Sequence, residues 1–63
     1  MSTTSRLLLR LDDVLLRVGL SRSTVYRLVA AHQFPTPVRL GTRSVAWRAE
    51  EVQAWIESRP SVR

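Results

Sequence analysis

Three residues, Gly19, Leu20 and Ser21, separate two segments whose apolar residues both repeat with helical spacing. Glycine is the residue that most easily takes the left-handed conformation that ends a helix. Serine is a preferred N-cap, because its hydroxyl accepts a hydrogen bond from an amide of the first turn. One helix therefore ends and the next begins within a single short turn, which forces the two helices to cross steeply. This spacing predicts a helix-turn-helix unit.

The segment before the turn predicts an amphipathic helix, because its apolar residues recur at positions i, i+3, i+4 and i+7: Leu11, Val14, Leu15 and Val18. Asp12 and Asp13 stand in its first turn, where acidic side chains complement the helix dipole. Before this helix, "LLLRL" is too short for its periodicity to decide between a small strand and an extended lead-in that packs Leu9 or Leu11 under the fold.

The segment after the turn predicts a helix over residues 22–31 or 22–32. Its inward set is spaced at three and four residues: Val25, Leu28 and Val29. Its outward set is more polar and basic: Arg22, Ser23, Tyr26, Arg27 and Ala30. A helix that served only the core would not need so basic a second face.

The segment after the second helix predicts a hairpin. Pro35 and Pro37 exclude a helix there, because proline removes an amide donor and holds its predecessor extended. Apolar residues then alternate with polar or small ones on both sides of a glycine-containing turn, which is a hairpin signal: Val38 and Leu40 before it, Val45 and Trp47 after it. The tip carries Gly41, Thr42 and Arg43.

A final helix is predicted from about Ala49, with an apolar face of Val52, Trp55 and Ile56, and Pro60 stops it. The expected fold is mostly α with a small β-hairpin, a winged helix-turn-helix. We expect residues 1–8 to form a flexible lead-in, residues 9–59 the domain and residues 60–63 a tail. Trp47 and Trp55 are expected in the core, not as stacking platforms for single-stranded bases, because so short a chain needs large residues to fill one core.

The charge balance points to nucleic acid. Ten arginines against five acidic residues give a net charge of +5 at pH 7 and a pI near 11.6, which is the electrostatic footprint of a nucleic-acid-binding domain. Binding to a membrane surface would need a basic amphipathic helix with bulky apolar residues left over for lipid. No apolar run approaches the ~18 residues of a membrane span. We therefore expect a cytoplasmic, nucleoid-associated protein with no membrane partner.

The residue types exclude several other classes of protein. The chain has no cysteine and one histidine, His32, so neither a disulfide nor a metal site is expected. Glu50 and Glu51 are neighbours on a helix and point apart, and two glycines do not make a phosphate-cradling loop. We expect no catalytic residues, no cofactor and no small-molecule ligand, and thus no enzyme.

The candidate DNA-binding residues lie in two groups. At the start of the second helix, free amides and a partial positive charge favour a phosphate, and arginine matches a guanine edge by two parallel hydrogen bonds. Arginine at a hairpin tip suits a narrow, negative minor groove. The nine candidates are Ser21, Arg22, Ser23, Thr24, Tyr26 and Arg27 in the helix, and Arg39, Thr42 and Arg43 in the wing.

Three blocks of the sequence, "GLSRSTVYRL", "FPTPVRLGTRSVAW" and "EEVQAWI", together resemble the AlpA-type phage regulators, relatives of excisionase and MerR-type winged helix-turn-helix domains. The resemblance covers about residues 9 to 59. It implies a double-stranded DNA-binding protein of a mobile element that regulates transcription or acts as an excisionase biasing an integrase. It also implies contacts by Arg22, Ser23, Tyr26, Arg27, Thr42 and Arg43. The chain departs from the family in "AAHQFP", where many relatives have a charged residue and a glycine before Phe-Pro.

One such module covers few base pairs, so useful affinity calls for several copies assembled on repeated or inverted sites. The alternative hypothesis is a protein-interaction module that docks on an integrase or a polymerase. It would use an exposed apolar patch, for which Leu7, Leu8 and Leu16 are the best candidates.

Overall fold

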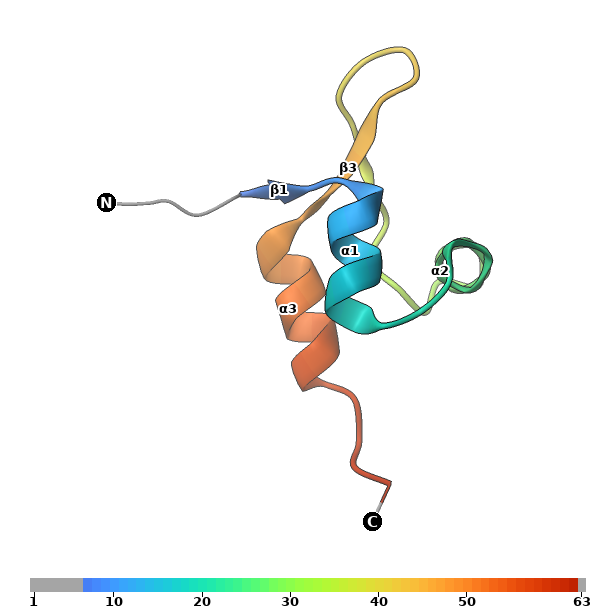
Figure 1. Ribbon diagram of the computed structural model, residues 1–63, viewed down its shortest axis with the longest axis vertical. Helices are drawn as coiled ribbons and strands as arrows, with labels where there is room; N and C mark the ends of the chain where they lie inside the picture. The colour runs from blue at the N-terminus through green and yellow to red at the C-terminus, as the bar shows by residue number, and fades with distance from the viewer. Residues whose placement is uncertain (1–6, 63) are drawn as a thin grey trace, which may run out of the picture.

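The computed structural model describes residues 7–62 and contains three helices and a small antiparallel sheet (Figure 1). The elements follow one another in the order β1 (Leu8–Leu9), α1 (Leu11–Val18), α2 (Arg22–Ala30), β2 (Val38–Arg39), β3 (Val45–Arg48) and α3 (Ala49–Glu57). This is the predicted winged helix-turn-helix arrangement, with β2 and β3 as the wing.

The turn between the first two helices has the predicted capping residues. Gly19 has φ 72°, and its amide donates to the Leu15 carbonyl over 2.8 Å. Ser21 is extended, and its Oγ accepts from the Thr24 amide at 3.3 Å. The helices cross steeply: Figure 1 looks nearly along the axis of α2, whereas α1 is seen from the side. The prediction from the three-residue turn is confirmed.

Helix α2 ends one or two residues earlier than predicted, because its last turn closes through a left-handed residue. His32 has φ 60°. Its amide donates to the Val29 carbonyl at 3.0 Å, and the Gln33 amide donates to the Leu28 carbonyl at 2.8 Å. These two bonds make a Schellman motif. A histidine thus stands in the conformation that usually selects glycine.

The sheet has three strands in the order β1-β3-β2, so the predicted hairpin is only part of it. The lead-in forms the short strand β1, which pairs antiparallel with β3 and sets Leu8 opposite Arg48 and Leu9 opposite Trp47. Leu9 is fully buried. Of the two expectations left open for this segment, the small strand is confirmed.

The wing departs from the predicted alternation at Leu40. In the ladder, Val38 faces Ala46 and Arg39 faces Val45, and β2 then ends. The Leu40 amide still donates to the Ser44 carbonyl at 2.7 Å, but the side chain is 48% exposed. The expectation that Leu40 continues the apolar alternation is wrong, because it already belongs to the loop that carries the tip out beyond the core.

The core is a cluster of buried residues drawn from every helix, two of the strands and the loop after α2: Leu9, Val14, Val25, Phe34, Trp47 and Val52. Trp47 is fully buried, and its Nε1 donates to the Pro35 carbonyl at 2.8 Å. Trp55 packs against the cluster, and its Nε1 donates to the Gln33 carbonyl at 2.7 Å. The expected core position of Trp47 is confirmed, and Trp55 lies at the edge of the core.

Candidate nucleic-acid interface

The N-terminal turn of α2 carries a connected set of hydroxyl groups, which the side chain of an arginine from the last turn reaches. Ser21 Oγ donates to Thr24 Oγ1 at 2.9 Å and lies 3.4 Å from Ser23 Oγ. Arg27 Nη2 donates to the same Thr24 Oγ1 at 3.3 Å. Thr24 is partly buried and the other three residues are exposed. Short donors and a long cationic side chain are therefore assembled at the positive end of the helix dipole.

Arg22 and Tyr26 lie on a flank of α2. Arg22 is exposed and makes no hydrogen bond or ion pair within residues 7–62. Tyr26 is 42% exposed, and its ring centroid lies 6.2 Å from that of Trp47, with the planes tilted by 59°. Because Trp47 belongs to β3, this contact packs the Tyr26 flank of α2 against the ribbon formed by β2 and β3.

The tip of the wing has one anchored arginine and one that projects. Arg39 Nη1 donates to the Thr42 carbonyl at 3.0 Å, which ties the guanidinium to the loop. Thr42 and Arg43 are exposed, and within the described chain Arg43 has no hydrogen-bond or ion-pair partner. The tip therefore presents positive charge at the end of the molecule that is uppermost in Figure 1.

Positive and negative charges are segregated along the chain. All five acidic residues lie in the first turn of α1 or in α3: Asp12, Asp13, Glu50, Glu51 and Glu57. Residues 14–49 contain six arginines and no acidic residue. Helix α2 and the β2–β3 ribbon consequently carry only positive charge.

The family comparison fits this geometry. Residues 7–60 match the family model described as the prophage CP4-57 regulatory protein (AlpA). The chain belongs to the AlpA family. AlpA proteins are small DNA-binding domains of the helix-turn-helix type, which agrees with the observed fold.

A second comparison is with a phage protein. The AlpA chain is 45% identical over 56 residues to a protein of Enterobacteria phage P4 named uncharacterized protein ORF88. The match covers 89% of this chain and 64% of the phage protein, so the chain spans somewhat less than two thirds of that relative. Family membership favours a regulatory, DNA-binding role. The phage protein adds only that a similar sequence occurs in a phage.

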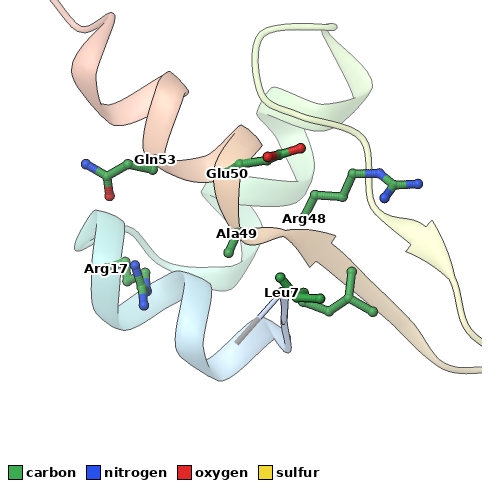
Figure 2. Close-up of a pocket in the computed structure, with 7 residues that line it drawn as sticks. Leu7, Arg17, Arg48, Ala49, Glu50 and Gln53 are labelled. Atoms are coloured by element: carbon green, nitrogen blue, oxygen red, sulfur yellow. The ribbon is translucent and has the colours of Figure 1, made fainter. Parts of the chain in front are cut away.

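An apolar groove lies away from α2, where β1 meets α1 and the start of α3 (Figure 2). Figure 2 shows Leu7 near Ala49, with Arg17 and Gln53 on one side and Arg48 on the other. Leu7 is 82% exposed. Leu16 on α1, which does not line this groove, is 84% exposed. This AlpA protein therefore has an exposed groove with apolar residues away from α2, although Arg17 and Arg48 also line it.

Residues 7–62 also lack the features of two other kinds of site. No helix there is both long and apolar enough to cross a bilayer. Within the same residues, no group of three or more His, Cys, Asp or Glu side chains is placed to hold a metal ion.

Sequence reasoning missed one cation next to α2, Arg59. It follows α3, and its guanidinium lies over the Trp55 ring, with Cζ 4.5 Å from the centroid. Trp55 and Arg59 are four residues apart, the spacing at which side chains on a helix meet. This four-residue spacing could have predicted the contact between Arg59 and Trp55 from the sequence.

Proposed function

We propose that this AlpA protein binds double-stranded DNA sequence-specifically, with α2 in the major groove and the wing on the flanking backbone or in the minor groove. The observation that carries the proposal is the exposed basic face of α2. Ser23 and Arg27 belong to or contact its hydroxyl network, Arg22 lies exposed beside it, and residues 14–49 contain no acidic residue.

The groups on α2 suit both kinds of DNA contact. Arg22 and Arg27 are long enough to reach a guanine edge, where two parallel hydrogen bonds specify the base. Ser21, Ser23 and Thr24 carry hydroxyls suited to phosphate oxygens, which position the helix without reading the sequence. Tyr26 can donate its hydroxyl to the backbone from the flank nearest the wing.

The wing supplies contacts of the second type. Arg43 projects from the tip, and insertion into a narrow minor groove would use its negative potential. Arg39, tied to the Thr42 carbonyl, keeps the tip compact and adds charge near the backbone. The wing therefore extends the contact beyond the base pairs that α2 reaches.

In this proposal the protein is a binding protein and not an enzyme, and it acts in the bacterial cytoplasm, where the DNA is. Several copies would assemble on repeated or inverted sites, since one recognition helix reads few base pairs. Two outcomes of binding fit a prophage or phage setting. The protein is a transcriptional regulator, or it is an excisionase that biases an integrase.

The test is binding to the DNA upstream of its own operon, measured by gel shift with competitor DNA at roughly 50 and 200 mM salt. Specific binding should survive competitor and weaken steeply as salt rises, since phosphate contacts release counterions. Arg27→Ala and Arg43→Ala should each weaken it severalfold or more. Arg17→Ala removes the same charge from an exposed residue of α1 and is the matched control.

Normal affinity in both Arg27→Ala and Arg43→Ala would overturn the assigned surface. Loss of affinity in Arg17→Ala equal to theirs would show that net charge alone, and not this surface, drives binding. An excision assay with the integrase of the same element, beside a promoter-reporter assay, separates the excisionase from the regulator.

The apolar groove favours a second candidate, docking on an integrase or a polymerase. Leu7 and Leu16 are too exposed to serve the core, and the groove that Leu7 lines has apolar and charged groups in its walls. Leu7→Ser together with Leu16→Ser should abolish co-purification with the integrase while DNA affinity is kept. A protein that acts only by docking would show no salt-sensitive specific DNA binding at all.

A further inference from the structure

Arg59 is held in one position by three contacts. Its guanidinium Cζ lies 4.5 Å from the centroid of the Trp55 ring, which is a cation–π arrangement. Its Nε donates to the Trp55 carbonyl at 3.3 Å, and Nη2 donates to Ser58 Oγ at 3.3 Å. Ser58 Oγ in turn donates to the Trp55 carbonyl at 2.8 Å. An arginine held in this way loses less side-chain entropy when it binds a ligand.

The support beneath Arg59 reaches into the core. The Trp55 ring stacks edge-on to Phe34, with centroids 4.8 Å apart, and its Nε1 donates to the Gln33 carbonyl at 2.7 Å. Arg59 is itself exposed, and no carboxylate of residues 7–62 forms an ion pair with it. Most of its N–H donors therefore still face solvent, fixed relative to the fold.

The position of Arg59 is beside α2, on the side away from the wing. Arg59 and Trp55 line one groove together with Thr24 and Leu28 of α2. At 100° per residue, Thr24 and Leu28 lie on the opposite flank of α2 from Arg22 and Tyr26, and the Tyr26 flank faces the ribbon through Trp47. In Figure 1, α2 lies to one side of the molecule, at a height between the hairpin tip and the end of α3.

We propose that Arg59 is a DNA-contacting residue that binds a backbone phosphate on the far side of α2 from the wing. The inference rests on the proposed function, since it takes α2 as the helix that enters the major groove. A helix in that groove, which is about 12 Å wide, has a phosphate backbone on each side. The wing serves one backbone and Arg59 serves the other. Thr24, whose hydroxyl accepts from Arg27, lines the same groove as Arg59.

The test compares Arg59→Gln with Arg59→Lys, with Arg27→Ala as the reference and Arg17→Gln as the matched control. Affinity for the operon-upstream DNA is measured by fluorescence anisotropy across a salt series. Arg59→Gln should weaken binding severalfold on specific and unrelated sequences alike, and lower the salt slope by about 1. Arg59→Lys should keep the slope. Arg17→Gln should change neither quantity.

A second measurement separates a phosphate contact from a purely structural role as the cap of α3. Single phosphates of the site are replaced by neutral methylphosphonates. Neutralising one particular phosphate should weaken DNA binding by the natural protein but not by Arg59→Gln. The same scan with Arg43→Ala should identify a second phosphate, whose neutralisation weakens binding by the natural protein but not by that variant. The two phosphates should lie on opposite sides of the major groove.

The outcomes distinguish the inference from the function beneath it. If Arg59→Gln keeps the full salt slope and responds to every methylphosphonate as the natural protein does, while Arg27→Ala loses affinity, the inference is wrong and the proposed function stands. If Arg59→Gln lowers only the melting temperature, the residue is a structural cap and the inference is again wrong. If the natural protein shows no specific DNA binding, both are wrong.

Discussion

Replacing His32 by glycine is expected to stabilise the protein, because the last turn of α2 closes through a residue with φ 60°. The Schellman bonds from the amides of His32 and Gln33 require this conformation. An L-residue with a Cβ pays about 1–2 kcal/mol to adopt it, whereas glycine does not. The histidine side chain is exposed and makes no hydrogen bond within the described residues, so its removal loses little.

The gain is reduced by the greater freedom of glycine in the unfolded chain, about 0.5–1 kcal/mol. The net stabilisation therefore lies between about 0 and 1.5 kcal/mol, with a midpoint near 0.75 kcal/mol. In a domain of this length each 1 kcal/mol moves the melting temperature by about 4–8 °C, so we expect a rise of about 3–6 °C. Thermal and urea denaturation followed by circular dichroism measure both quantities.

His32→Ala is the control, because it removes the imidazole and keeps the Cβ. It should not stabilise the protein. If His32→Gly melts at or below the temperature of the natural protein, the left-handed conformation is not the source of strain. If His32→Ala gains as much as His32→Gly, the imidazole itself is unfavourable and the backbone argument is refuted.

Three further stability changes follow from the fold, each measured by urea denaturation. Gly19→Ala should cost about 1 kcal/mol, from φ 72° alone, since an added Cβ would meet no atom within 4 Å; unchanged stability would contradict this. Ser21→Ala should cost about 1 kcal/mol through loss of the N-cap, whereas Ser21→Asp should restore most of it. Trp47→Phe should cost about 1–3 kcal/mol, because the Pro35 carbonyl loses its donor in a part-buried place; a loss below about 0.5 kcal/mol would show that water replaces the indole.

The sequence predicted the helix-turn-helix well because its signals are local. Gly19 and Ser21 act on the backbone of their own turn, and the apolar stripe of residues 11–18 recurs over two full turns. Strand β1 was left undecided, because two residues show no period and the strand exists only through its pairing with β3. Leu40 was misjudged for a related reason: where a strand ends is decided by the ladder, and not by the residue pattern.

The candidate site likewise combines features that local sequence could predict with features that depend on the folded structure. The cap by Ser21 and the basic face of α2 follow from helix geometry, so they could be placed in advance. The bond from Arg39 to the Thr42 carbonyl depends on the loop conformation, and the contact of Tyr26 with Trp47 depends on packing across 21 residues of chain. Arg59 was missed because its place beside α2 depends on how α3 packs.

The two tryptophan indoles that donate to the Gln33 and Pro35 carbonyls have a consequence for how the protein meets its target. They clamp the connection between α2 and the ribbon from both sides of Phe34, one from α3 and one from β3. These bonds hold α2 and the wing at a preset separation. In the proposed binding mode, a duplex whose grooves do not match that separation would have to bend or twist, so selection among sites would depend on how easily each DNA deforms.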